Sequence, residues 1–528
     1  MFTFVWLRIV VVLTLTICYA TRTNQDFADV NLPTNHLVRY FNTFPYLRDK
    51  CLDSQNCPYY DILKNDSAKS VCWGYETSCK PPNNFQTPQC LGDHTGWVQN
   101  KEAQLDTFFY QADFGYIRQQ IDEMSVMCEP TYREDSSLEC TKYLRFCRGR
   151  NLMINFTDLS KRHDLIRYNM NVLSQGQIGG HCRLHRKRLM NEMEHMGALQ
   201  SWAPELRYFE EKDFRPITGN GKCDIVVEKP TYIMKIDANY NMYHHFCDFI
   251  NLYASLFVNQ SHPLAFDTDT QVLIWESYPY ESPFAETLKA FTKNPIWNLD
   301  NVRGKVVCFK NLVLPLLPRM IFGLYYNTPI INGCEKSGLF RAFSEFITHR
   351  LQIPMHEKIN SKIRITFLSR KTKYRQALNE DELIAEISGN RDYFVRRISF
   401  ERGMSFSDQL QIIRNTDILI GMHGAGLTHL LFLPNWATIF ELYNCEDPNC
   451  YKDLARLRGV SYITWKDKSK LQTKDEGSQQ KGGAHAKFVN YEFDPKEFAS
   501  LVANGAQLVR DHDEFKVHLK PSSQRDEL

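Results

Sequence analysis

The chain has 528 residues, which is too long for a single hydrophobic core and indicates about three folding units. Its formal net charge of +2 is close to neutral, so the composition provides no large basic surface and argues against a nucleic-acid partner. Hydrophobic residues make up 43% of the chain and aromatic residues 13%, which is enough for packed globular domains.

The first twenty residues have the pattern of a cleaved secretory signal. One positive charge, Arg8, precedes an apolar run from Ile9 to Ile17, and small or polar residues follow near Ala20. A signal anchor is the alternative, although the run is short for a bilayer and Arg8 interrupts any longer one. No later segment approaches a spanning length. We therefore expect residues 1–20 to be removed and the mature chain to have no transmembrane segment.

Residues 21–205 are rich in cysteine. Of the 16 cysteines in the chain, one lies in the predicted signal and eight crowd the following part of the first third, at Cys51, Cys57, Cys72, Cys79, Cys90, Cys128, Cys140 and Cys147. In a secreted chain this density predicts disulfides, and no C-x-x-C motif supports a thioredoxin-type oxidoreductase. Fifteen mature cysteines leave at least one thiol unpaired. Three sequons, at Asn65, Asn155 and Asn259, are candidate N-glycosylation sites.

The pattern of elements changes along the chain. Residues 21–205 contain amphipathic stretches such as 102–127, which predict a mostly helical region held by disulfides. Residues 206–353 form a first alternating unit, with strands expected at 224–227, 231–236, 270–275 and 305–309. After a polar linker, residues 354–520 form a second, with strands expected at 363–368, 394–398, 417–420 and 437–442. Alternation of strands and helices predicts parallel sheets, so the expected fold class is α/β, with two Rossmann-like halves facing a cleft.

A glycine-rich turn follows the strand expected at 417–420. The turn reads GMHGAG from Gly421, and a short helix ended by Pro434 is expected after it. Glycines let a backbone approach a ligand closely, and a helix start presents free N–H groups to phosphate. The order strand, turn, helix, strand predicts a diphosphate site at Gly424, Ala425, Gly426 and Leu427. An ordinary strand-to-helix turn is the alternative, because the spacing is not that of G-x-G-x-x-G, and a hydrolase would need a G-x-S-x-G motif that the chain lacks.

The last four residues form a charged tail, Arg525, Asp526, Glu527 and Leu528. They resemble the address by which a retrieval receptor returns soluble proteins to the endoplasmic reticulum. A charged tail without such a role is the alternative. Together with the predicted signal, the tail predicts a soluble resident of the endoplasmic reticulum lumen that binds the retrieval receptor.

Several motifs carry a resemblance to a known family. GMHGAGLTH from Gly421, followed by Phe432-Leu-Pro434 and Glu441-Leu-Tyr443, resembles the signature of glycosyltransferase family 61. NMYHHFCDF from Asn241, LLPRM from Leu316, GLFRAF from Gly338 and YNCED from Tyr443 resemble one branch of that family. The resemblance runs from about Cys72 to the C-terminus.

This resemblance implies a GT-B-like catalytic region that uses UDP-GlcNAc as donor. The implied reaction moves N-acetylglucosamine, with inversion, to Ser or Thr of folded EGF-like repeats. The implied partners are extracellular and membrane proteins that contain such repeats, among them Notch-like receptors and matrix proteins. Two alternatives stay open: another family 61 activity, such as transfer of N-acetylglucosamine onto O-mannose or of xylose onto glycans, and a lumenal chaperone or lectin without catalysis.

The residues expected to bind the UDP-sugar lie in the second half. Arg370 and Arg375 follow the strand at 363–368, at the strand end where open α/β sheets bind ligands, and guanidinium suits phosphate. A solvated basic loop is the alternative for both. Glu441 is expected to accept hydrogen bonds from the ribose hydroxyls, because a carboxylate within an apolar strand is costly unless it is paired. His423 is expected to contact the diphosphate or to make a structural hydrogen bond within the turn.

The cluster YHHFCD, from Tyr243 to Asp248, is the best source of a catalytic base. In a helix from Tyr243 to Tyr253, His244 and Asp248 would share a face at i, i+4 that points into the cleft. Asp248 is the expected base or the partner of the base, and His244 and His245 are the other candidates. A capping Asp with structural histidines is the alternative, and a zinc site lacks an evident third ligand.

A role for a divalent metal is left open. Metal-using glycosyltransferases commonly hold the diphosphate through a D-x-D motif, and Asp267-Thr-Asp269 has that pattern. Its position just before a strand is more typical of a turn. Asp267 and Asp269 are therefore only weak candidate ligands.

Overall fold

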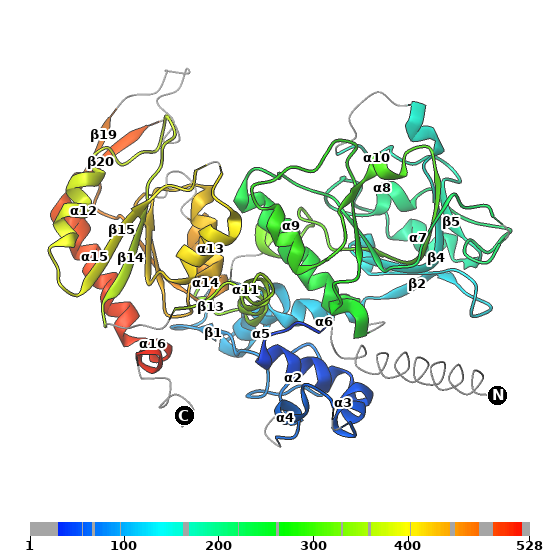
Figure 1. The fold of residues 1–528 in the computed structure, drawn as a ribbon, viewed down its shortest axis with the longest axis horizontal. Helices are drawn as coiled ribbons and strands as arrows, with labels where there is room; N and C mark the ends of the chain where they lie inside the picture. Colours follow the sequence, from blue (N-terminus) through cyan, green and yellow to red (C-terminus); the bar gives the residue numbers. More distant parts are fainter. Residues whose placement is uncertain are drawn as a thin grey trace, which may run out of the picture.

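The computed structural model describes residues 30–519 except residues 55, 66–68, 96, 162–167, 220, 260–262, 329–330, 357–360, 402, 444–448 and 475–488. The predicted signal and C-terminal tail lie outside the described residues. Figure 1 shows two sheets side by side, with the N-terminal helices and α11 (Gly338–Arg350) below and between them in this view. No helix of the described part is long and apolar enough to cross a membrane.

The N-terminal part of the chain begins with helices. They are α2 (Thr34–Thr43), α3 (Pro45–Leu52) and α4 (Tyr60–Leu63), then, after the short strand β1 (Gln89–Cys90), α5 (Lys101–Ala112) and α6 (Phe114–Asp122). The predicted amphipathic stretch 102–127 is thus two helices followed by a strand. The break falls at Asp113, whose side chain caps α6 by accepting a hydrogen bond of 2.8 Å from the Phe114 N–H.

The first sheet has 11 strands and runs across the predicted boundary at residue 205. Its strands are β2 (Ser125–Glu129), β3 (Ser137–Cys140), β4 (Cys147–Asn155), β5 (Ile178–Gly180), β6 (Arg183–Leu184), β7 (Phe209–Glu211), β8 (Ile225–Val227), β9 (Thr231–Met234), β10 (Gln271–Ile274), β11 (Trp297–Asn298) and β12 (Val306–Leu314). The four strands expected in this half are present, and β9 pairs in parallel with β10 and β12. The sheet is mixed, because β4, from the cysteine-rich region, pairs antiparallel with β12.

Helices connect these strands. They are η2 (Lys142–Leu144), η3 (Thr157–Lys161), α7 (Arg186–Asn191), α8 (Ala203–Leu206), α9 (Met242–Val258), η4 (Pro263–Phe266), η5 (Ala285–Ala290) and α10 (Leu299–Val302), and they are followed by η6 (Tyr325–Asn327), the strand β13 (Cys334–Glu335) and α11. The predicted helix at 243–253 is confirmed as the first part of α9. Asn241 caps it by accepting a hydrogen bond from the Tyr243 N–H.

The second sheet has five parallel strands in the order β15-β14-β16-β17-β18. Its elements in chain order are β14 (Ile363–Leu368), α12 (Glu380–Ser388), β15 (Tyr393–Ile398), α13 (Phe406–Arg414), β16 (Ile418–Gly421), η7 (Ala425–Phe432), β17 (Thr438–Glu441), α14 (Cys450–Arg458) and β18 (Ser461–Thr464), followed by η8 (Lys468–Lys470), β19 (Leu471–Lys474), β20 (Asn490–Phe493), α15 (Pro495–Asp511) and α16 (Asp513–His518). The four strands expected here are confirmed. The chain leaves β14 towards one edge of the sheet and leaves β16 towards the other, which makes their boundary a topological switch point.

Hydrophobic packing joins the two halves. One face of the second sheet forms a separate core with the C-terminal helices, whereas Leu419 of β16 and Ile439 of β17 belong to the larger core that continues into the first half. Phe246 of α9 and Phe432 of η7 meet in this core with ring centroids 5.4 Å apart. This contact fixes the start of α9 relative to η7 and to the glycine turn that precedes it.

Six disulfides are present among the described cysteines: Cys51–Cys57, Cys72–Cys79, Cys90–Cys334, Cys128–Cys182, Cys140–Cys147 and Cys223–Cys308. The prediction of disulfides is confirmed. Cys247, which is buried in α9, is a free thiol, as the odd number of mature cysteines requires.

The three candidate glycosylation residues differ in exposure. Asn65 is exposed, and Asn155 is half-buried at the end of β4. Asn259 is buried, and its Nδ2, the atom that a glycan would modify, donates a hydrogen bond of 3.2 Å to the hydroxyl of Tyr232. The folded chain therefore presents Asn65 best, and Asn259 is the candidate that its structure disfavours.

Candidate functional site

A cavity of about 1170 Å³ lies where the two halves of the chain meet. It is lined by Tyr240, Asn241, Tyr243, His244, Tyr326, Leu368, Ser369, Arg370, Lys371, Thr372, Arg375, Ser399, Phe400, Glu401, Met422, His423, Gly424, Ala425, Gly426 and Tyr451. The first five of these come from the start of α9, the residues before it and η6, and the others come from the second half. Leu368 and Met422 mark the carboxyl ends of β14 and β16, so the cavity opens at the switch point, where open α/β sheets bind ligands.

The predicted arginines both line this cavity. Arg370 Nε donates to Thr372 Oγ1 at 2.6 Å and to the Tyr374 carbonyl at 3.2 Å. Arg375 Nη1 donates to the His423 carbonyl at 3.3 Å, and its buried Nε has no hydrogen-bond partner among the described residues. Arg375 also has a φ of 59°, an uncommon value for a long side chain. The two guanidinium groups are thus held beside the glycine turn.

The glycine turn is shaped to accept Arg370. A Cβ at Gly424 would lie 2.2 Å from Arg370 Nη1, so only glycine leaves room for the guanidinium in this position. Gly424, Ala425 and Gly426 line the cavity, as predicted. Leu427 does not: its side chain is fully buried, and its N–H already donates to the Gly424 carbonyl at 2.9 Å. Leu427 therefore has neither its N–H nor its side chain available for the predicted phosphate contact.

Glu441 has a different role from the predicted one. It is fully buried at the end of β17, its Oε1 lies 2.6 Å from His423 Nδ1, and its Oε2 accepts a hydrogen bond of 2.6 Å from the Tyr462 hydroxyl. Both carboxylate oxygens have partners inside the protein, and the group does not line the cavity, so it does not face the ribose hydroxyls of a bound donor. Through this contact Glu441 orients the ring of His423 at the cavity wall.

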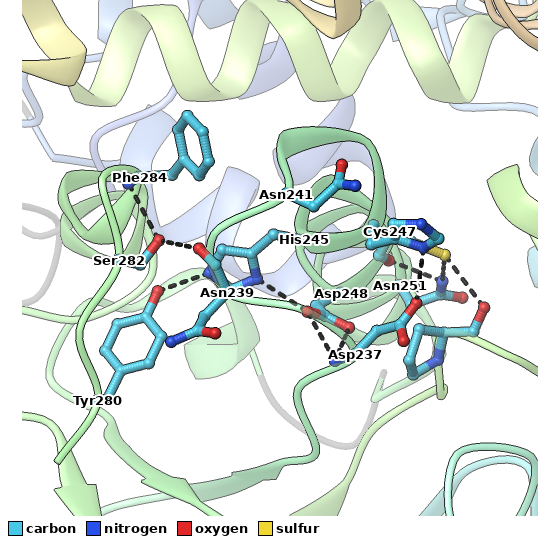
Figure 2. Close-up of polar contacts among 12 residues, drawn as sticks. Asp237, Asn239, Asn241, His245, Cys247, Asp248, Asn251, Tyr280, Ser282 and Phe284 are labelled. Atoms are coloured by element: carbon cyan, nitrogen blue, oxygen red, sulfur yellow. Dashed lines mark hydrogen bonds and ion pairs between the residues drawn. The ribbon is translucent and has the colours of Figure 1, made fainter. Parts of the chain in front are cut away.

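The three candidate catalytic residues of α9 separate in the fold. His244 lines the cavity, whereas His245 and Asp248 are buried beneath it. Figure 2 shows that His245 lies between Asp248 and Tyr280: its Nδ1 is 2.8 Å from Asp248 Oδ2, and its Nε2 is 2.7 Å from the Tyr280 hydroxyl. Sequence spacing alone favoured His244 with Asp248 at i, i+4, but Asp248 contacts His245 at i, i+3 instead.

Burial changes the protonation of this buried pair. Burial, and then the charge of Asp237, raises the pKa of Asp248 well above its usual range, and burial lowers the pKa of His245 to about 3. Asp248 is fully buried and does not line the cavity, so it does not reach a substrate bound there. Of the three candidates, His244 is the one whose side chain lines the cavity. Asp248 instead accepts the backbone N–H of Asp237 at 3.2 and 3.3 Å.

Sequence reasoning missed two residues that contact His244. Asp237 Oδ2 lies 3.1 Å from His244 Nδ1, and Arg319 forms a bidentate pair with the Asp237 carboxylate at 2.8 and 3.1 Å. Two signals were available. Asp237 directly follows the expected strand at 231–236, just as Arg370 follows β14, and Arg319 lies within the motif LLPRM.

The D-x-D motif has the contacts of a turn. Asp267 Oδ1 accepts the backbone N–H of Asp269 at 2.8 Å, and Asp269 pairs with Lys229 at 2.7 Å. Neither residue lines the large cavity. Within the described ranges, the one cluster with metal-ligand spacing is Cys72, Glu76 and Cys79, and its two sulfurs form a disulfide.

Comparisons with known proteins place this chain in a family. The Glycosyltransferase 61 family model matches residues 242–440, which run from the start of α9 into β17 and so include His244, both arginines and the glycine turn. An EGF domain-specific O-linked N-acetylglucosamine transferase of Drosophila melanogaster is 62% identical over 508 residues, covering 96% of each chain. The chain belongs to glycosyltransferase family 61.

Proteins of other organisms with the same name are also similar to this chain. The Mus musculus protein is 45% identical and covers 93% of this chain and 92% of its own. The Xenopus laevis protein is 42% identical and covers 95% and 94%. The similarity to these members of family 61 extends well beyond the matched domain, into the N-terminal helices and the C-terminal elements.

Proposed function

We propose that this chain transfers N-acetylglucosamine from UDP-GlcNAc to Ser or Thr of folded EGF-like repeats, with inversion at the anomeric carbon. One observation carries the proposal: a single cavity brings His244 of one half together with Arg370, Arg375 and the glycine turn of the other, in a chain closely similar to enzymes named for this activity. The two halves act as the paired domains of a GT-B-like transferase, with the cavity as the cleft between them.

The second half binds the donor. The leaving diphosphate carries negative charge, and Arg370, Arg375 and the N–H groups at the start of η7 supply positive charge beside it. His423, oriented by Glu441, presents Nε2 to the same cavity. These groups stabilise the charge that develops as the bond between the sugar and UDP breaks, which is the largest electrostatic demand of the reaction.

The first half supplies the base. The hydroxyl oxygen of the acceptor attacks the anomeric carbon, the bond from that carbon to the diphosphate oxygen breaks, and UDP leaves with the electron pair. The proton of the hydroxyl passes to His244 Nε2. His244 fits this role because it lines the cavity with Nδ1 turned towards Asp237.

The protein acts in the lumen of the endoplasmic reticulum. The predicted signal at 1–20 and the tail at 525–528 support this location, with the retrieval receptor as a binding partner, and the six disulfides fit an oxidising compartment. Its acceptors are then extracellular and membrane proteins with EGF-like repeats, which already carry their own disulfides when they meet the enzyme.

Purified protein incubated with one folded EGF-like repeat and a panel of UDP-sugars tests the proposal. With UDP-GlcNAc, and with no other sugar of the panel, intact-mass spectrometry should show that the repeat gains the mass of one N-acetylhexosamine. The reduced and alkylated repeat should react poorly, because it must be ordered before it binds. Parallel reactions with a chelator show whether a divalent metal takes part.

Two variants complete the test. His244→Gln should bind UDP normally and lose transfer, whereas Arg375→Ala should lose UDP affinity by about 1.5–3 kcal/mol, the value of one charge-assisted hydrogen bond. Preference for another sugar or for O-mannosyl acceptors would assign a different family 61 activity. If the protein bound folded repeats but transferred no sugar, its function would be that of a chaperone or lectin and not that of an enzyme.

A further inference from the structure

His244 is held by charged groups from two distant parts of the chain. Asp237, in the segment between β9 and α9, is 6% exposed and faces His244 Nδ1 at 3.1 Å. Arg319, which follows β12, donates Nε and Nη2 to the two oxygens of Asp237. Tyr326 lies over the other side of Arg319, 3.9 Å from the guanidinium carbon to the ring centroid. The guanidinium is thus clamped between a carboxylate and an aromatic face.

The charge of Asp237 is maintained by these contacts. Burial raises the pKa of Asp237, but the hydrogen bonds from His244 and Arg319 outweigh it, and the pKa lies below its ordinary value. Asp237 is therefore a carboxylate throughout the neutral range. An ionised carboxylate has no proton to donate, so the hydrogen bond at 3.1 Å requires the proton to be on His244 Nδ1.

We infer that Asp237 and Arg319 position His244 and hold it in the tautomer with the proton on Nδ1, so that Nε2 is the proton acceptor in the cavity. This inference rests on the proposed function for its catalytic meaning and on geometry for the tautomer. When Nε2 takes the acceptor proton, the resulting imidazolium is stabilised by Asp237. Asp237 and Arg319 are positioning residues, because they act on the reaction through His244.

Other charged and titratable groups also face His244. On the side of the first half they are Asp237, Arg319, Tyr243 and Tyr326, and across the cavity they are Arg370, Lys371, Arg375, Glu401, His423 and Tyr451. Of these, Asp237 is the carboxylate in hydrogen-bonding distance of His244 in the described structure. Glu401 pairs with Lys371 instead. Asp237 therefore sets the tautomer of His244, whereas the charged groups across the cavity are mostly cations.

One contact defines the competing arrangement. Arg319 Nη2 also lies 3.1 Å from His244 Nδ1. If Arg319 donated to Nδ1, the proton would sit on Nε2 and His244 would be a hydrogen-bond donor in the cavity. The bidentate pairing of Arg319 with Asp237 favours the first arrangement, since it directs the guanidinium hydrogens to the carboxylate.

Nitrogen NMR of the full-length protein labelled with 15N-histidine decides the tautomer. Comparison with His244→Gln identifies the signals of His244. We expect a protonated Nδ1 and an unprotonated Nε2 near neutral pH, and loss of this pattern in Asp237→Asn. A protonated Nε2 with an unprotonated Nδ1 in the unsubstituted protein would overturn the inference, whatever the enzyme does.

Kinetics separate positioning from general stability. Asp237→Asn should lower kcat by about 100-fold or more, the usual contribution of a general base, while the Kd for UDP stays within about 2-fold, a difference under 0.5 kcal/mol. The double variant Asp237→Asn/His244→Gln should be no slower than His244→Gln alone, because residues that act as a unit are not additive. Arg319→Lys should retain more activity than Arg319→Met.

Asp135 is the matched control. It is equally buried, accepts Arg215 Nε at 2.8 Å and two backbone N–H groups, and does not line the cavity. Asp135→Asn should therefore keep kcat. Full kcat in a folded Asp237→Asn, or additive losses in the double variant, would refute positioning. If the unsubstituted protein transferred no sugar at all, the proposed function would fail and the NMR pattern alone would decide the tautomer.

Discussion

Gly424→Ala is expected to weaken UDP binding through a neighbouring side chain. The added methyl carbon would lie 2.2 Å from Arg370 Nη1, far inside van der Waals contact. The guanidinium is the flexible partner and should swing away, and the φ of 157° at Gly424, which side chains rarely adopt, adds strain within the turn. The substitution thus moves Arg370 from the cavity wall without touching its charge.

The size of the effect follows from the bond that Arg370 would lose. One charge-assisted hydrogen bond to the diphosphate is worth about 1.5–3 kcal/mol, so the Kd for UDP should rise by about 10- to 150-fold. If the whole effect passes through Arg370, then Gly424→Ala in an Arg370→Ala background should add little.

Calorimetric titration with UDP measures these affinities. Gly92→Ala is the matched control, since Gly92 also has a positive φ, 70°, and a Cβ there would meet nothing within 4 Å. An unchanged Kd in folded Gly424→Ala would refute the placement of the diphosphate beside Arg370. Fully additive losses in the double variant would instead show that the ligand itself needs the space at Gly424.

Three further predictions concern other parts of the chain. Glu441→Gln should weaken UDP binding by about 1–3 kcal/mol by releasing the ring of His423, and His423→Ala should add little to it in a calorimetric double-mutant cycle. Burial raises the pKa of Asp113 to about 7, so its stabilising contribution is present below about pH 4 and is lost as the pH rises through 7. Asp113→Asn does not titrate, so between pH 4 and 7 its unfolding free energy, relative to that of the unsubstituted protein, should increase by up to about 4 kcal/mol. Denaturant titration of both proteins at several pH values measures this difference. Deletion of residues 525–528 should send active protein into the culture medium, and full intracellular retention on immunoblots would contradict the retrieval tail.

The strands of the second sheet could be predicted well because each carries its own local signal. The run at 363–368 is observed with the same bounds as β14, and the run at 417–420 is shifted by one residue in β16. Local patterns also placed Arg370 and the glycine turn correctly, since both directly follow strand ends and the carboxyl ends of parallel strands meet at one edge. The extension of the first sheet into the cysteine-rich region was not predictable in this way, because the pairing of β4 with β12 joins residues 151 to 167 positions apart.

The errors in the site have one physical origin. Helical spacing predicted which residues share a face of α9. It could not predict which face is covered by the segment that precedes the helix in the chain. The segment at Asp237 covers Asp248 and presents its own carboxylate to His244. For Glu441, the argument that a buried carboxylate needs partners was correct, but the partners are His423 and Tyr462 rather than a ligand.

The cavity has a first wall, formed by the first half of the chain, and a second wall, formed by the second half. On each wall, a histidine has its Nδ1 in contact with a buried carboxylate. His244 has Asp237 and His423 has Glu441, and in each pair one member lies just beyond a strand: Asp237 is three residues after the end of β9, and His423 is two residues after the end of β16. The difference lies in the surroundings. Arg319 pairs with Asp237 on the first wall, whereas on the second wall Arg375 donates to the backbone carbonyl of His423. Under the proposed function, Asp237 and Arg319 orient the proton acceptor on the first wall, and the arginines of the second wall supply positive charge to the departing diphosphate.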